Sequence, residues 1–260
     1  MILKNLKSLG SNTSFIPRNP KGMNEEKDVF GAALWDYHCT PGDQELITWT
    51  SLTEKDPVPI GYFFRNFDQM PSIEQKAMEL SQGKILDVGC GAGSHGLYLQ
   101  NQKKLEVTGI DKSAGAIKTA KDRGMQRLHQ QSIFEFQGDT FDTILLLMNG
   151  PGICGRLDQL HLLLKKLKTL VSPHGQILLD SSDLVYLFDE NSAGEKIIPA
   201  NHYYGELEYG IRYRGKQEMF PWLYVGYDLL HLHAAQIGLY AERVMEGENW
   251  DYLARLTMEY

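Results

Sequence analysis

The sequence predicts an α/β protein with a doubly wound sheet, and two observations carry this prediction. Between residues 84 and 180, five apolar segments alternate with helix-like segments, as a parallel sheet with crossover helices requires. The first apolar segment runs directly into a glycine-rich turn, KILDVGCGAGSHG at 84–96. Glycine lets backbone N–H groups approach a ligand closely, so a strand, turn and helix in this order indicate a site for a polar or anionic group.

The composition bounds the kind of protein. The chain has 260 residues, of which 42% are hydrophobic and 23% charged, which suits one large domain with additions. Its net charge of -7 argues against nucleic acid as a partner, and no apolar run is long enough to span a membrane. The three cysteines, Cys39, Cys90 and Cys154, show no metal-binding spacing and fit a reducing cytoplasm.

Residues before the first core strand divide into two parts. Ser, Asn, Pro and Gly are frequent near the N-terminus, so we expect a loose tail over 1–24. Residues 25–83 should form a mostly helical cap, with short helices over 28–37 and from Pro71 to near Gly83. The intervening stretch mixes a β-like run with prolines, so we expect irregular structure or a short edge strand there.

The core strands follow from the apolar pattern. The run FDTILLLM is almost unbroken, as expected of a strand that is covered on both faces. Leucines from 157 to 167 recur at helical spacing before the fifth strand. The five predicted strands cover 84–88, 105–110, 126–131, 141–148 and 176–180.

The last third of the chain alternates polar and apolar residues. GELEYGIRYRG and QEMFPWLYV predict an inserted β-hairpin within 203–224, before the final helix. That helix should end at Gly238, and two further strands are expected over 239–246 and 250–258.

The glycines of the turn fit two motifs. Residues 91–96 spell GxGxxG, the dinucleotide fingerprint, and Asp111 lies about 20 residues further on. Residues 87–93 spell DxGxGxG, which also accounts for Asp87. A carboxylate just before the turn is costly without a polar partner, and an ammonium would be a natural one.

In the second frame the turn resembles motif I of the class I S-adenosylmethionine (SAM)-dependent methyltransferases, and VTGID at 107–111 resembles the next motif of that family. The resemblance covers roughly residues 84–180, and the closing helix and hairpin also resemble the family's. It implies a Rossmann-like seven-stranded sheet with an antiparallel last strand, within a SAM-binding domain over 84–260. The expected activity is methyl transfer from SAM to a small-molecule acceptor by in-line displacement.

The resemblance also implies roles for particular residues. The glycine turn would face the amino-acid end of SAM, Asp111 would bind the ribose hydroxyls, and Asp87 would hold the SAM ammonium or brace the turn. Gln131 and Ser132 stand where the family often has an acid that meets the adenine amine. The expected cofactor-binding residues are Asp87, Gly89, Cys90, Gly91, Gly93, Asp111, Lys112, Gln131, Ser132, Ile133, Met148 and Asn149.

The acceptor should lie where strand four ends, at MNGPG (148–152), because ligands bind beyond the carboxyl ends of such strands. This is not the Asn-Pro-Pro-aromatic motif of methyltransferases that modify adenine or glutamine. The expected acceptor-binding residues, from this turn, the cap and the hairpin, are Tyr37, Tyr62, Asn149, Tyr203 and Trp222. A phenol or protonated amine would need a base, and His38, Tyr37 or His202 are candidates, but no spacing identifies a catalytic residue.

Two other functions remain open at this stage. An NAD-linked oxidoreductase shares the glycine turn and Asp111, and a non-catalytic SAM-binding protein would keep the whole cofactor pattern. The sequence predicts no metal site and identifies neither the acceptor nor the oligomeric state, which we expect to be a monomer or homodimer.

Overall fold

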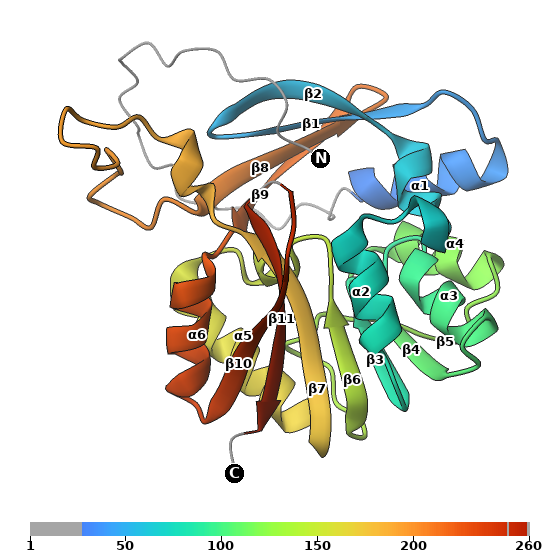
Figure 1. Ribbon diagram of the computed structural model, residues 1–260. Coiled ribbons are helices and arrows are strands. Elements are labelled where there is room, and N and C mark those ends of the chain that lie inside the picture. Colours follow the sequence, from blue (N-terminus) through green and yellow to red (C-terminus); the bar gives the residue numbers. More distant parts are fainter. Residues whose placement is uncertain (1–27, 249, 259–260) are drawn as a thin grey trace.

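The computed structural model describes residues 28–248 and 250–258, so the expected tail over 1–24 lies outside the described residues. Two sheets make up the architecture (Figure 1). A seven-stranded sheet with helices on both faces carries the glycine turn, and a four-stranded sheet lies across its upper edge. Among the described residues, no helix combines the length and apolar character needed to cross a membrane.

The seven-stranded sheet confirms the predicted fold. Its strand order is β10-β11-β7-β6-β3-β4-β5, with parallel pairing from β7 to β5 and β11 antiparallel between β7 and β10. The strands are β3 Lys84–Val88, β4 Glu106–Asp111, β5 Arg127–Gln130, β6 Phe141–Leu146, β7 Val171–Ser182, β10 Leu239–Glu246 and β11 Asp251–Met258.

Alternate side chains of the central strands enter two separate apolar cores. Ile144 of β6 faces the core under α5 and α6, whereas Leu145 faces the core under α2 and α3. Both are fully buried, which explains why the strand reads as a continuous apolar run. The helices are α2 Ser72–Leu80, α3 Ser94–Asn101, α4 Ala114–Asp122, α5 Leu157–Leu170 and α6 Tyr227–Ala235.

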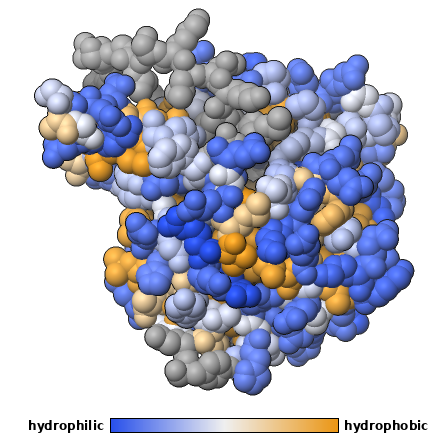
Figure 2. All heavy atoms as spheres, viewed as in Figure 1, coloured by the Kyte–Doolittle hydropathy of each residue, from blue (hydrophilic) through white to orange (hydrophobic). Residues whose placement is uncertain are grey.

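The outer strands are covered less completely. Val244 and Met245 of β10 are only partly buried against the core beneath α2. Figure 2 shows the corresponding band of apolar surface over β10, β11 and α2. The centre of the sheet, where the glycine turn leaves β3, is therefore the best-packed part of the domain.

The four-stranded sheet contains the predicted hairpin and two strands of the cap. Its order is β2-β1-β8-β9, and the strands are β1 Glu45–Thr50, β2 Thr53–Pro59, β8 Glu206–Tyr213 and β9 Lys216–Leu223. The cap thus has two paired strands where irregular structure or one short edge strand was expected. Pro57 and Pro59 are compatible with β2 because this strand lies at the sheet edge, where a missing backbone N–H removes few hydrogen bonds. The positive φ angles of Arg214 (46°) and Gly215 (79°) suit the two-residue turn of the hairpin.

The first helix, α1 Val29–Cys39, joins the cap to the cofactor side of the fold. Asp28 caps α1 through the N–H of Gly31 (2.9 Å) and also accepts hydrogen bonds from the Ser113 hydroxyl (2.7 Å) and the Gly115 N–H (2.7 Å) at the start of α4. The two helices meet at glycines, since a Cβ on Gly115 would stand 2.4 Å from the carbonyl carbon of Gly31. The described part of the chain also has four short 3-10 helices: η1 Ile60–Phe64, η2 Phe67–Gln69, η3 Gly150–Cys154 and η4 Leu184–Leu187.

This close approach predicts that Gly115→Ala destabilises the fold. Alanine should favour the helix by up to about 1 kcal/mol, but the added methyl group meets backbone, so we expect a net loss of about 1–3 kcal/mol in the free energy of unfolding. Denaturant unfolding measures it, with the exposed Lys121→Ala in the same helix as the control. A Gly115→Ala protein as stable as the wild type would show that α1 does not need this contact.

Candidate functional site

The glycine turn is held in place by backbone hydrogen bonds to the neighbouring strand. The N–H groups of Gly89 and Cys90 both donate to the carbonyl of Ile110 in β4, at 2.8 and 3.1 Å. Gly89, Gly91 and Gly93 have φ angles of 72°, 53° and 82°, which side chains rarely adopt. The sequence needs glycine here because the chain must reverse sharply between β3 and α3.

Gly91 differs from the other glycines of the turn in what surrounds it. A Cβ on Gly93 would stand 2.8 Å from the sulfur of Met125, and one on Gly96 would stand 2.5 Å from its methyl carbon, so both serve helix packing. A Cβ on Gly91 would meet no atom within 4 Å. The backbone of Gly91 therefore borders open space, as a turn that holds a ligand requires.

Asp111, at the end of β4, braces this turn. One carboxylate oxygen accepts from the N–H of Gly91 (3.0 Å) and the other from the N–H of Ser113 (2.9 Å). Burial raises the pKa of Asp111, and the two hydrogen bonds oppose that rise. Asp111 thus braces the turn, a role that the sequence suggested for Asp87.

Asp87, near the end of β3, is a buried acid with one unpartnered carboxylate oxygen. Its side chain is 2% exposed, and Oδ2 has no hydrogen-bond partner among the described residues. Burial raises its pKa, a nearby His95 lowers it, and the charge of Asp111 raises it further. A buried carboxylate in this state is costly, and a bound cation would compensate it.

The three residues after β5 lie beside Asp111. The N–H of Gln131 donates to the carbonyl of Asp111 (2.9 Å), and the Ser132 hydroxyl accepts from the N–H of Phe134 (3.3 Å). Ile133 is buried in the core. The backbone of Gln131 is thus joined to that of Asp111, while its side-chain amide donates to the carbonyl of Glu135 (3.1 Å).

Cys90 and Lys112 contribute less to the site. The Cys90 side chain is buried, and burial raises the pKa of its thiol well above the usual range, so the thiol stays neutral. Lys112 is exposed. Only the backbone of Cys90 takes part in the geometry of the turn.

The turn after β6 has an unusual backbone. Met148 and Asn149 are consecutive non-glycine residues with positive φ, 64° and 63°. The Asn149 N–H lies 3.1 Å from both carboxylate oxygens of Asp180, while its side-chain amide donates to the carbonyl of Leu223 (3.1 Å) and accepts from the Ser181 hydroxyl (2.6 Å). Strain of this kind is concentrated at functional sites. Because its side chain is fully engaged, Asn149 links β7 to the hairpin.

Asp180, near the end of β7, is a site residue that sequence reasoning missed. Burial raises its pKa to about 7, and the Asn149 N–H opposes that rise. Its charge also acts on the hydroxyl groups of Tyr62 and Tyr224. The only signal in the sequence is an acid closing the strand QILLD, beside the MNGPG turn. An acid with such a pKa can exchange protons near neutral pH.

The structure brings some of the expected acceptor residues together. Trp222 lies against Gly152, because a Cβ there would stand 2.0 Å from the indole ring, and Tyr62 lies near Asp180. Tyr203 is set slightly apart, with its hydroxyl accepting from the N–H of Gly226 (3.0 Å). Asn149, Tyr62 and Trp222 thus surround the end of β6.

The other three candidate positions point elsewhere. Tyr37 packs against Phe64, with ring centroids 4.8 Å apart. His38 pairs with Asp122 of α4 at 2.7 Å, and His202 is exposed. None of the bases suggested by the sequence therefore lies beside the MNGPG turn.

A buried ion network connects the cap with both sides of the site. Glu74 of α2 binds the guanidinium of Arg65, and its other contact is His95 of α3, at 2.6 Å. The Arg65 guanidinium also donates to the carbonyl of Tyr62 (2.6 Å). Burial acts to raise the pKa of Glu74, but the hydrogen bonds and charges of His95 and Arg65 hold it below its usual value.

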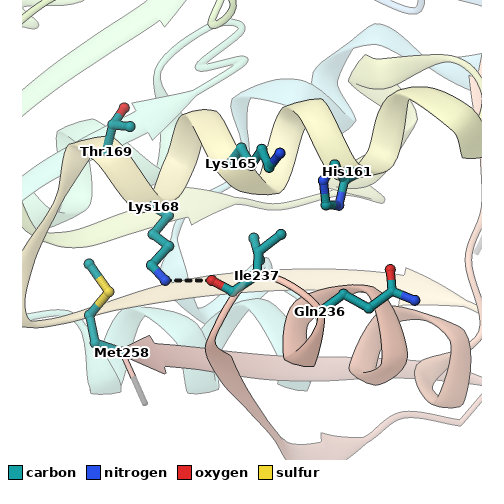
Figure 3. A pocket seen from close by; sticks show the side chains of 7 residues that line it. All are labelled: His161, Lys165, Lys168, Thr169, Gln236, Ile237 and Met258. Atoms are coloured by element: carbon teal, nitrogen blue, oxygen red, sulfur yellow. Dashed lines mark hydrogen bonds between the residues drawn. The ribbon is translucent and has the colours of Figure 1, made fainter. Parts of the chain in front are cut away.

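A surface hollow lies at the opposite edge of the molecule. His161, Lys165 and Lys168 of α5 line it together with the end of α6, and Lys168 donates to the carbonyl of Ile237 there (Figure 3). It lies at the amino edge of the parallel strands, away from the glycine turn. Within 28–248 and 250–258, no group of His, Cys, Asp and Glu side chains could hold a metal ion.

Comparison with known proteins places this geometry in a family. A methyltransferase-domain family model matches residues 79–225, more than half of the chain. No curated protein matches the sequence of this chain. Among solved structures, a SAM-dependent methyltransferase from Bacteroides fragilis in complex with S-adenosyl-L-homocysteine is 41% identical, covers 92% of this chain and 98% of its own, and has a TM-score of 0.83.

More distant structures share the fold alone. The sugar N-methyltransferase KedS8 from Streptoalloteichus sp ATCC 53650 is 13% identical over 98% of this chain and 100% of its own, with a TM-score of 0.54. A SAM-dependent methyltransferase from Clostridium acetobutylicum ATCC 824 is 16% identical over 72% and 89%, with a TM-score of 0.54. The comparisons favour the DxGxGxG frame of the turn over the dinucleotide frame. The chain belongs to the SAM-dependent methyltransferases.

Proposed function

We propose that the protein transfers a methyl group from SAM to a small-molecule acceptor at the carboxyl edge of the seven-stranded sheet. The observation that carries the proposal is the pairing of a buried, unpartnered Asp87 oxygen with the open space beside Gly91. A ligand with a cationic amino-acid end fits both features. The structure of the similar Bacteroides fragilis protein was solved with S-adenosyl-L-homocysteine, the product of such a transfer.

Particular residues would hold the donor. Asp87 would take its ammonium, the glycine turn would border its amino-acid end, and Asp111 would meet the ribose with whatever hydrogen-bonding capacity the turn leaves free. Gln131 and Ser132 would lie at the adenine end. SAM supplies a methyl group on a sulfonium, so the protein mainly has to align the acceptor, and such alignment can contribute about 7–11 kcal/mol.

A small acceptor is supported by what covers the MNGPG turn. Trp222 of the hairpin packs on Gly152, and the Asn149 amide bonds to Leu223, so the four-stranded sheet lies directly over this end of β6. Aromatic rings with polar ends, such as those of Tyr62 and Trp222, suit a partly apolar molecule. The net charge of -7 disfavours nucleic acid, and a fold shared with a sugar N-methyltransferase is consistent with a small acceptor.

We expect S-adenosyl-L-homocysteine to raise the melting temperature, because a ligand that binds only the folded state stabilises it. At 100 times its dissociation constant the gain is about 2.7 kcal/mol. A thermal-shift measurement with NAD as the control ligand checks this. A transition that moves with NAD and not with SAM or S-adenosyl-L-homocysteine would contradict the proposed cofactor.

The two acids of the site should respond differently to substitution. Asp111→Ala leaves the N–H groups of Gly91 and Ser113 unpaired, so we expect it to lower the stability of the ligand-free protein by about 1–3 kcal/mol for each group that stays buried. Asp87→Asn removes an uncompensated buried charge, so it should leave ligand-free stability unchanged or higher. It should instead weaken S-adenosyl-L-homocysteine.

Denaturant unfolding and titration calorimetry on the same proteins separate the two effects. The exposed Asp139→Asn, which removes only a surface ion pair with Lys84 at the start of β3, is the matched control. If Asp87→Asn binds S-adenosyl-L-homocysteine as tightly as the wild type, Asp87 does not hold the ammonium. If Asp111→Ala unfolds like the wild type, the turn does not depend on that carboxylate.

A further inference from the structure

The acceptor side of the site carries a negative charge with no cation bound to it. Asp180 accepts from the Asn149 N–H, and no Lys, Arg or His among the described residues forms an ion pair with it. The nearby cations, Arg65 and His95, are both engaged by Glu74. The titratable groups whose charges couple to Asp180 come from five neighbouring segments: Tyr62, Glu74, His95, Tyr224 and Tyr252.

Asp180 is also placed where an acceptor would have to stand. It lies near the end of β7, next to β6, and its carboxylate holds the strained Asn149 backbone at the turn that Trp222 covers. It is partly exposed, unlike the fully buried residues that precede it in the strand. An acid that is hydrogen-bonded to the MNGPG turn lies beside the space that an acceptor would occupy.

We propose that the methyl acceptor is an amine, and that Asp180 is a catalytic residue that binds its ammonium form and takes up its proton. This inference rests on the proposed function. An ammonium supplies the positive charge that Asp180 lacks, whereas an alcohol or phenol brings none.

The proton and electron pairs balance in this scheme. An ammonium has no lone pair, so it must first lose a proton, which the Asp180 carboxylate accepts and later passes to water. The freed nitrogen lone pair then forms the N–CH3 bond while the S–CH3 bond breaks. The electron pair of the broken S–CH3 bond stays on sulfur, which becomes a neutral thioether. Asp180, with a pKa of about 7, is ionised often enough near neutral pH to act as this base.

The raised pKa has a consequence that needs no substrate. Below the ordinary value of 3.8 both folded and unfolded states hold the proton, and between 3.8 and about 7 only the folded state keeps it. The folded state therefore loses stability from Asp180 as pH rises through this window. Asp180→Asn, which cannot titrate, should gain melting temperature relative to the wild type between pH 5.5 and 8.5. A carbon NMR titration of the protein with labelled aspartates should show one carboxyl resonance whose shift changes with a midpoint near pH 7, and Asp180→Asn should lack this resonance.

The acceptor itself can be tested without knowing its identity. The protein is incubated with SAM carrying a 13C-methyl group and a fractionated extract of small metabolites, and mass and NMR spectra locate the label. We expect it on nitrogen, and Asp180→Asn should slow its appearance by about 10²–10⁴-fold at pH 7, whereas the control Asp139→Asn should not.

Binding of S-adenosyl-L-homocysteine, measured on the same samples, separates this inference from the proposed function. Asp180→Asn should retain that binding, because it leaves the glycine turn intact. If the ligand binds and label appears only on oxygen, carbon or sulfur, or on no nitrogen compound, the inference is overturned while cofactor binding stands. Undiminished transfer by a folded Asp180→Asn protein would equally exclude Asp180 as the base. If no cofactor binds at all, the proposed function fails first.

Discussion

The buried carboxylate of Glu74 is the constraint on which both sides of the site depend. Through Arg65 it fixes the cap segment that carries Tyr62, and through His95 it reaches α3 beside Asp87. Removing one member of such a network leaves an uncompensated charge, which typically costs about 3–5 kcal/mol. The cap and the glycine turn are therefore coupled by charge as well as by packing. A shift of Glu74 would disturb the donor side and the acceptor side together.

Buried charge also explains the acids near the ends of β3, β4 and β7, which are Asp87, Asp111 and Asp180. Burial raises the pKa of all three acids; backbone N–H groups bind both oxygens of Asp111, whereas one oxygen of Asp87 has no partner among the described residues and Asp180 forms no ion pair there. A fold does not gain stability from such groups, and their presence at a ligand edge is understandable only if ligands complement them. A cationic donor and a cationic acceptor would each compensate one of the two acids.

The sequence predicted correctly those features that neighbouring residues determine. The apolar run of β6, the glycine turn and the hairpin all follow from neighbouring residues, and the structure has each of them. It failed where the cause is a distant partner. Ile47 of β1 pairs with Arg212 of β8, and no local pattern shows that two cap strands will extend the hairpin into a sheet. Likewise Asp111 and Asp87 differ only through which backbone N–H groups the turn presents to them.

That long-range pairing also changes how the acceptor site can open. β8 pairs with β1 as well as with β9, so the hairpin is joined to the cap strands and is not a separate flap. Trp222 and Leu223 fasten it to the MNGPG turn, while β1 is tied to the chain that carries Tyr62. An opening of the acceptor side would therefore involve the cap strands as well as the hairpin. Because Glu74 joins the same cap to His95 of α3, such a movement would also change the contacts on the donor side of the site.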